Sequence, residues 1–186
     1  MIKDISSLHD FELIDKVVSG NVACYSELVK RHQSLVATTA MNMVGDMDDA
    51  RDIGQMVFIR FYKSIASFKK EAKLSTYLTR ITINLSLNHL KRMKKFSDRS
   101  NNLDLVKLKP TQDFVNDIES KELVNLALQK LEEHHRSIVI LRMIQGYSTL
   151  ETAEILEIPK GTVLSRLKRA MDKLKIILTN EFNYER

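Results

Sequence analysis

The sequence has one cysteine, Cys24, two prolines, five glycines and no tryptophan among its 186 residues. A single cysteine excludes an intrachain disulfide and any metal site built from several thiolates, and it predicts a reducing, cytoplasmic location. So few glycines and prolines disfavour a turn-rich all-β fold and favour helices. No stretch approaches ~20 uninterrupted apolar residues, so no membrane insertion is expected. Residues 1–10 carry no secretory signal.

Charge is unevenly distributed along the chain, although the net charge is only +5. Residues 69–97 carry eight basic and one acidic side chain, and residues 134–186 carry nine and six. Residues 1–68 and 98–133 are net acidic. Two basic zones that alternate with acidic ones are typical of a protein that contacts a polyanion at two separate points. Solvated helix faces are the alternative interpretation of either zone alone.

Apolar residues at helical spacing predict four helices in the first half of the chain. The expected helices cover residues 10–19, 22–44, 49–65 and 75–95. Gly45 ends the second of them. Asp46, Asp48 and Asp49 follow at once, where carboxylates suit the positive end of the next helix. The spacing of a calcium-binding EF-hand loop is missing, so we interpret these three as capping residues.

The second half of the chain begins with a change in composition. Residues 97–118 are polar, acidic and aperiodic and contain Pro110, which predicts a linker. Helical periodicity resumes near Glu119. We therefore expect an all-α fold with two small helical domains, residues 10–96 and 119–180, joined by a flexible linker.

Residues 137–178 carry the pattern of a helix-turn-helix. Ser148 and Glu151 have the spacing of a capping box at the start of a short helix. Residues 157–159 form a tight turn, and Pro159 suits the beginning of the next helix. That helix has one apolar and one basic side, as a helix that enters the major groove of DNA requires. Helix pairs of this kind also occur in proteins that never touch DNA, so this alternative stays open.

Three motifs in the two halves of the chain resemble those of one protein family. Residues 52–58 read Asp-Ile-Gly-Gln-Met-Val-Phe, and a spaced set follows at Phe68, residues 75–78, Arg80 and Asn84. Residues 161–170 read Gly-Thr-Val-Leu-Ser-Arg-Leu-Lys-Arg-Ala. These motifs are similar to those of bacterial sigma-70-type RNA polymerase sigma factors of the extracytoplasmic-function (ECF) group, in the same order.

This resemblance implies that the chain binds core RNA polymerase, directs it to specific promoters and helps to melt DNA. The residues implied to contact the clamp of the largest polymerase subunit are Asp49, Asp52, Gln55, Met56 and Ile59. Those implied to bind the minus-ten element, including its melted strand, are Lys73, Ser75, Thr76, Tyr77, Arg80, Asn84, Asn88, Lys91 and Arg92. Those implied to bind the minus-thirty-five element are Thr162, Leu164, Ser165, Arg166, Lys168 and Arg169. The family also implies an anti-sigma factor as a partner.

Two departures from the family pattern concern these residues. Met56 stands where the family often has Glu, and Tyr77 stands where it usually has Trp. Tyrosine keeps an aromatic face on which an unpaired base can stack, a contact worth ~1–3 kcal/mol per base. A buried tyrosine with a satisfied hydroxyl is the alternative for Tyr77, and the sequence leaves both open.

The residues that enzymes use for chemistry do not gather in this sequence. It shows no nucleophile–base pair, no phosphate-binding glycine loop and no cluster of metal ligands, so we predict no catalytic residues, no metal and no cofactor. His134 and His135 are adjacent and therefore point in different directions on a helix. We interpret both as surface residues.

Two other functions account for parts of the sequence. A helix-turn-helix repressor or activator that works without polymerase explains the second half but not the basic zone at residues 69–97. Such a protein binds duplex DNA by itself, usually as a dimer. A helical protein-interaction scaffold predicts no salt-dependent affinity for DNA, whereas phosphate contacts give a steep dependence on salt.

Overall fold

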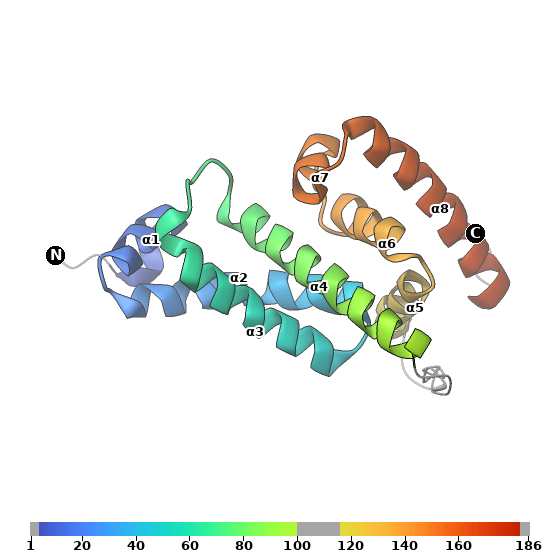
Figure 1. The fold of residues 1–186 in the computed structure, drawn as a ribbon, viewed down its shortest axis with the longest axis horizontal. Helices are drawn as coiled ribbons and strands as arrows, with labels where there is room; N and C mark the ends of the chain where they lie inside the picture. Colours follow the sequence, from blue (N-terminus) through green and yellow to red (C-terminus); the bar gives the residue numbers. More distant parts are fainter. Residues whose placement is uncertain (1–3, 100–115, 183–186) are drawn as a thin grey trace.

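The computed structural model describes residues 4–99 and 116–182, which are helical and contain no strand within those ranges (Figure 1). The first domain comprises a 3₁₀ turn at Ile5–Ser7, α1 (Asp10–Val18), α2 (Val22–Val44), α3 (Met47–Ser64), a second 3₁₀ turn at Ile65–Ser67 and α4 (Leu74–Arg99). The second domain comprises α5 (Asn116–Gln129), α6 (Glu133–Val139), a π-helical turn at Ile140–Ile144, α7 (Thr149–Leu156) and α8 (Lys160–Phe182).

The core of the first domain lies where the apolar stripes of its helices meet. Leu28, Val57, Phe61 and Leu78 are buried there, one or two from each of α2, α3 and α4. Helix α2 has the predicted bounds and ends at Gly45. Helix α3 begins earlier than predicted because the Asp46 carboxylate accepts hydrogen bonds from the backbone N–H groups of Asp48 and Asp49, both at 2.9 Å. The capping role predicted for these aspartates is therefore confirmed.

Helical structure extends three residues into each end of the predicted linker. Helix α4 continues through residues 97–99, and α5 already includes residues 116–118. No glycine or proline interrupts the chain between residues 75 and 109, so nothing local ends α4 at residue 96. The remainder of the predicted linker, residues 100–115, lies outside the described residues.

The segment before the helix-turn-helix changes its helix type. Its backbone starts as an α-helix at Glu133 and widens after Val139 into a π-helical turn, where Gln145 N donates to Ile140 O at 2.9 Å. Apolar periodicity does not reveal this change of helix type. Four consecutive residues, 138–141, are buried, and such a run is compatible with an α-helix and with a π-helical turn alike. The π turn brings Gln145 and Tyr147 to the end of the helix that faces the first domain.

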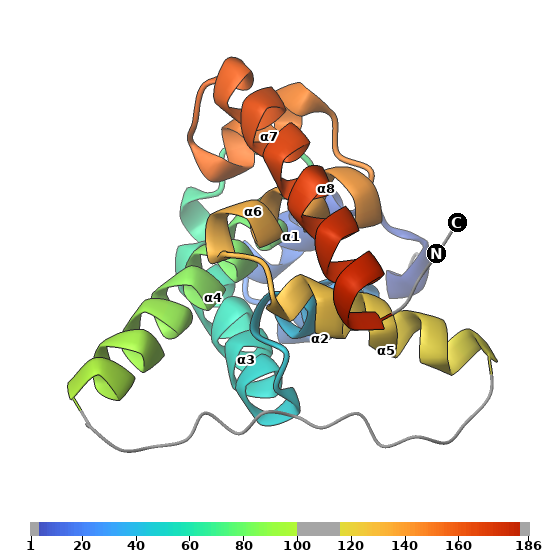
Figure 2. The ribbon, with the colours of Figure 1, turned by 90° about the vertical axis from the view of Figure 1, so that its right-hand side faces the viewer.

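The two domains pack directly on one another. Helix α7 lies over α4, and α5 lies beside α2 (Figures 1 and 2). The buried cluster of the second domain includes Met43 from α2 and Ile83 from α4. The predicted two-domain, all-α fold is confirmed, and the structure adds that the domains share a core. None of the helices within the described ranges is both long and apolar enough to cross a membrane.

Candidate nucleic-acid interface

Helices α7 and α8 form the predicted helix-turn-helix. The Ser148 hydroxyl accepts from Glu151 N at 3.2 Å, and the Glu151 carboxylate accepts from Ser148 N at 2.8 Å. Hydrogen bonding of the Glu151 carboxylate to the backbone N–H and the side chain of Ser148 holds the pKa of Glu151 below its usual value. Glu157 ends α7 in the left-handed conformation with φ 54°, and Pro159 precedes α8. Residues within a few positions of the turn thus determine where α7 ends and where α8 begins.

Helix α8 presents a basic face to solvent. Val163 and Ala170 are fully buried against the rest of the domain. On the other side Ser165, Lys168 and Arg169 are exposed, and Leu164 is 56% exposed. Of the six residues predicted to contact the minus-thirty-five element, only Thr162 and Arg166 are partly buried. The structure therefore brings this predicted set together on one accessible surface.

The residues predicted to contact the minus-ten element lie on helix α4, apart from Lys73, which directly precedes it, and they are less uniformly accessible. Five of them are exposed: Lys73, Asn84, Asn88, Lys91 and Arg92. Ser75, Tyr77 and Arg80 are partly buried, and Thr76 is only 9% exposed. The accessible members follow one side of α4 toward its C-terminal end.

Tyr77 has features of both alternatives that the sequence left open, a hydroxyl with a partner and an aromatic ring beside a cavity. Its hydroxyl lies 3.2 Å from the Ser64 hydroxyl, and its ring centroid lies 4.9 Å from that of Phe68. The same ring lines a cavity of about 510 Å³, to which Phe68, Lys70 and Arg80 also contribute. An aromatic wall beside cationic side chains is the arrangement that single-stranded nucleic acid requires.

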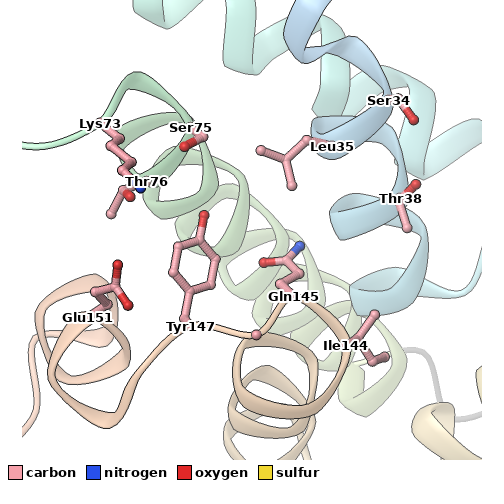
Figure 3. Close-up of a pocket in the computed structure, with 11 residues that line it drawn as sticks. Ser34, Leu35, Thr38, Lys73, Ser75, Thr76, Ile144, Gln145, Tyr147 and Glu151 are labelled. Carbon is pink, nitrogen blue, oxygen red and sulfur yellow. The ribbon is translucent and has the colours of Figure 1, made fainter.

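The second domain contacts this part of α4. Arg80 Nη2 donates to the backbone oxygen of Glu154 at 2.8 Å, and Arg80 Nη1 lies 3.9 Å from the Glu157 carboxylate. Tyr147 places its hydroxyl 3.0 Å from that of Thr79. A crevice of about 520 Å³ remains between the domains, lined by Lys73 and Thr76 on one side and by Tyr147 on the other (Figure 3).

An exposed face of α3 carries most of the residues predicted to contact polymerase. Asp52, Gln55, Met56 and Ile59 are exposed there. Asp49 is partly covered, because its carboxylate pairs with His89 Nε2 at 3.0 Å. Sequence analysis missed one member of this face: Tyr62, three residues beyond Ile59, is also exposed.

The interpretation of both adjacent histidines as surface residues was wrong for His135, which is 5% exposed. Glu132, His134 and His135 place potential metal-ligating atoms within 4.8 Å of one another. However, Lys173 already pairs with the Glu132 carboxylate at 2.8 Å. Burial lowers the pKa of His135, and the positive charges of His134, Lys173 and Arg166 lower it further. This cationic neighbourhood disfavours a divalent cation, so we assign no metal here.

Sequence analysis also missed Arg136, which is 6% exposed in α6. Its guanidinium donates to the backbone oxygens of Gln129 and Leu131 at 2.8 and 2.9 Å and to that of Met43 in the other domain. Burial lowers its pKa to about 10. The available sign in the sequence was a charged residue two positions before the apolar run 138–141.

Comparison with protein families agrees with this two-domain division. Residues 28–96 match the family model "Sigma-70 region 2", and residues 121–174 match "Sigma-70, region 4". The chain is 30% identical over 179 residues to the ECF RNA polymerase sigma-E factor of Haemophilus influenzae, covering 90% of this chain and 94% of that protein. It is 28% identical over 173 residues to the ECF RNA polymerase sigma factor SigW of Bacillus subtilis, covering 87% and 92%.

Solved structures share the fold. CnrH, solved in complex with the cytosolic domain of CnrY, superposes with a TM-score of 0.68 at 24% identity and covers 91% of this chain and 96% of that one. The sigma factor RpoE of Bartonella quintana, solved with the anti-sigma factor NepR, gives a TM-score of 0.69 at 22% identity and covers 84% and 97%.

Proposed function

Because the chain belongs to the ECF group of sigma-70 factors, which direct RNA polymerase to promoters, we propose that its two basic faces read two promoter elements while α3 holds the polymerase. The observation that carries this assignment is the exposed face of α8, with Leu164, Lys168 and Arg169 accessible behind a capped α7. Lysine and arginine on such a helix contact guanine edges and phosphates in the major groove. We assign α8 to duplex DNA at the minus-thirty-five element.

We assign α4 and the cavity at its N-terminal end to the minus-ten element. Lys91 and Arg92 supply phosphate contacts, which position the protein without reading sequence. Asn84 offers a donor and an acceptor to a base edge. The ring of Tyr77 lines the cavity beside Arg80, which supports stacking on an unpaired base of the melted strand.

We assign the exposed face of α3 to the clamp of the largest polymerase subunit. Met56 and Ile59 are 43% and 46% exposed, beside the exposed polar residues Asp52 and Gln55. Apolar side chains within a polar rim are typical of a protein contact surface. Asp49 contributes once its pair with His89 opens.

Further parts of this proposal follow from the family. Sigma factors are promoter-specificity subunits, and we propose that this chain has no catalytic activity of its own and leaves nucleotidyl transfer to the polymerase. We propose that it acts in the cytoplasm, where bacterial RNA polymerase meets the chromosome. The CnrH and RpoE structures each contain a second protein, and in the RpoE structure this protein is an anti-sigma factor. We propose an anti-sigma factor for this chain too.

The test is co-elution with sigma-free core polymerase, followed by run-off transcription on pooled promoter fragments of the host. We expect stable co-elution and new start sites from which the two elements are read. Ile59→Asp places a charge on the α3 face and should abolish co-elution. Val22→Asp adds the same charge at an exposed position of α2 and serves as the matched control.

The alternatives make different predictions in the same experiment. A regulator that works without polymerase fails to bind core but binds a specific duplex by itself. A protein-interaction scaffold binds neither core nor DNA in a salt-dependent way. Either result contradicts the assignment of these faces.

A further inference from the structure

The loop that joins α3 to α4 contains a residue in an unfavourable backbone conformation (Figure 1). Lys70 has φ 59°, and among the described residues only Glu157 is another non-glycine with positive φ. Glu157 ends α7, where a left-handed residue closes a helix. Lys70 ends no helix, because it lies within the irregular segment 68–73. A lysine in a conformation that suits glycine or asparagine must be held there by its surroundings.

Helix α1 holds the side chain of Lys70. The ammonium group donates to Asp15 Oδ1 at 2.5 Å, across 55 positions of the sequence. The Lys70 side chain is 33% exposed, whereas its neighbours Lys69 and Glu71 are exposed. Because the Asp15 side chain is 68% exposed, this ion pair adds little to the free energy of unfolding. Its effect is on the conformation of the loop rather than on the stability of the domain.

A ring of α1 supports the beginning of the same loop. The ring centroids of Phe11 and Phe68 lie 6.3 Å apart. Phe68 also lies 4.9 Å from Tyr77 and 6.2 Å from Phe61, again between ring centroids. Phe11 is 39% exposed, so it covers Phe68 rather than filling the core. Helix α1 therefore contacts the loop at two points, Phe68 and Lys70.

Helix α1 is itself anchored to α2. Arg31 of α2 donates to the backbone oxygens of Leu8 at 2.7 Å and Ser6 at 2.8 Å, just before α1 begins. The Arg31 guanidinium also donates to the Asp10 carboxylate at 3.1 Å, and His32 Nε2 lies 2.8 Å from the same carboxylate. The apolar face of α1 is buried in the core. These contacts fix α1 in place, so it can hold the loop in a defined position.

The loop held by α1 forms much of the wall of the cavity that we assign to an unpaired base. Every residue from 67 to 72 lines this cavity, together with Tyr77 and Arg80 of α4. Lys70 and Phe68, the two loop residues that α1 contacts, both belong to this wall. A wall that is ordered before binding does not have to be ordered by the ligand, which favours tight and selective binding.

We propose that α1 sets the base preference of this cavity: Asp15 and Phe11 are positioning residues that hold the loop through Lys70 and Phe68. The inference rests on the proposed function, because it concerns which base of the minus-ten element the cavity accepts. Without the Asp15 carboxylate, Lys70 relaxes to a negative φ and the wall moves with it. A relaxed wall accepts different bases with similar affinities.

The test uses holoenzyme reconstituted from sigma-free core polymerase and the full-length chain. The template is a promoter that the wild-type holoenzyme transcribes, with its minus-ten element randomised and each version linked to a barcode in the transcript. Sequencing of the transcripts gives the base preference at each position. Asp15→Asn keeps the size of the side chain and removes its charge. We expect it to reduce the ratio between the most and least favoured base roughly fivefold at one position, and to leave the other positions unchanged.

Three readouts distinguish positioning from a loss of structure. Asp15→Asn should co-elute with core polymerase as the wild type does and should unfold within ~2 °C of it, because an exposed ion pair contributes little to stability. Asp15→Glu keeps a carboxylate for the lysine and should retain the wild-type preference. Glu122→Gln removes an exposed negative charge from α5 and serves as the matched control, which should also retain it.

A double variant tests whether Asp15 acts through Lys70. Glycine adopts φ 59° without strain and offers no ammonium group, so Lys70→Gly removes both the strain and the ion pair. In this background Asp15→Asn should change the preference no further, because the two side chains act as one unit. Phe11→Ala, which removes the other support of the loop, should weaken the preference at the same position.

The outcomes separate this proposal from the proposed function. A wild-type preference in Asp15→Asn overturns the positioning role, as does an equal loss at every position or a further loss in the Lys70→Gly background. In each of these cases transcription by the wild-type holoenzyme still supports the sigma assignment. If the wild-type chain neither binds core polymerase nor supports transcription, the proposed function fails, and with it the minus-ten preference that α1 would set.

Discussion

The faces of α4 and α8 that we assign to promoter DNA are both basic, but they differ in how far their residues are exposed to solvent. Lys168 and Arg169 on α8 are exposed, and Leu164 extends beside them. On α4, Arg80 is bound by the second domain and Thr76 is buried. The face of α8 arises within its own domain and persists wherever the other domain lies. Access to the α4 face depends on where the second domain sits.

This difference has a consequence for regulation. A face that depends on the position of another domain can be controlled by anything that moves that domain. A face defined by local folding is controlled only by covering it or by unfolding its domain. We therefore expect changes at the domain contact to alter minus-ten binding strongly and minus-thirty-five binding weakly.

The largest test of this comparison removes Arg136. Arg136→Leu leaves the backbone oxygens of Met43, Gln129 and Leu131 without this donor, and we expect a loss of roughly 2–4 kcal/mol in the free energy of unfolding. Urea denaturation measures it. Arg136→Lys keeps the charge but not the forked geometry and should lose less. Equal stability of Arg136→Leu and the wild type would show that these hydrogen bonds contribute nothing to the free energy of unfolding.

The effect of truncating a side chain on the exposed face of α8 should not depend on the contact between the domains. Arg169→Ala is expected to weaken binding to the minus-thirty-five duplex by ~1–3 kcal/mol and to relax its sequence preference. Gel shifts with the selected duplex and its point mutants measure both effects. We expect the same loss in a Met43→Asp background, in which a charge disrupts the core that the two domains share. A different loss there would break the distinction between the two faces.

The effect of truncating a side chain on the face of α4 that the second domain contacts should depend on that contact. Arg80→Ala is expected to reduce binding of single-stranded DNA by about 1 kcal/mol more in the Met43→Asp background than in the wild type, because separation of the domains frees Arg80 Nη2 from the backbone oxygen of Glu154. The salt slope of the open chain should also fall by about one. A double-mutant cycle over a salt series gives both numbers, and a coupling of zero means that Arg80 is free in both states.

The two turn glycines in the first domain offer a smaller test of the same contact. Gly20 and Gly45 have φ of 98° and 78°, where alanine is strained by ~1 kcal/mol. A Cβ at Gly20 meets open space, whereas one at Gly45 lies 2.5 Å from the Gln129 side chain of the second domain. We expect Gly45→Ala to lose about 1 kcal/mol more than Gly20→Ala in thermal unfolding. Equal losses would place Gln129 away from Gly45 in solution.

The smallest expected effect is a dependence of stability on pH in the second domain. Burial holds the pKa of His135 below its usual 6.5. Below pH 6.5 the unfolded chain therefore binds a proton that the folded chain does not, so stability falls as pH falls, by at most ~1.4 kcal/mol per unit. His135→Gln should flatten the dependence between pH 6.5 and 5 in urea denaturation. Glu132, whose pKa is lowered by Lys173, contributes to the pH dependence of stability only below about pH 4.5.

Much of the fold follows from local patterns. The bounds of α2, the capping box at Ser148 and the cap at Asp46 depend on residues within a few positions of one another, so the sequence shows them directly. The positions of Lys168 and Arg169 follow from helical periodicity in the same way. Helical structure extends past both ends of the predicted linker, because polar composition does not end a helix when no breaker is present.

The domain contact has no comparable local pattern. Arg136 binds Met43 across 93 positions in the sequence, and Tyr147 reaches Thr79 across 68. Nothing near Met43 or Ile83 distinguishes a side chain that packs within its own domain from one that packs against another. The burial of His135 has the same origin, because it depends on α8 folding back over α6.

The sequence by itself determined the helices, their caps, the two basic zones and the family. These depend on periodicity, turn chemistry and charge, which act over one or two helical turns. Only the tertiary structure decided which basic residues are free, because access depends on surfaces brought together from distant parts of the chain. Arg80 shows the difference: the family motif predicts it as a DNA contact, whereas the packing of α7 on α4 places it in a hydrogen bond with the backbone oxygen of Glu154.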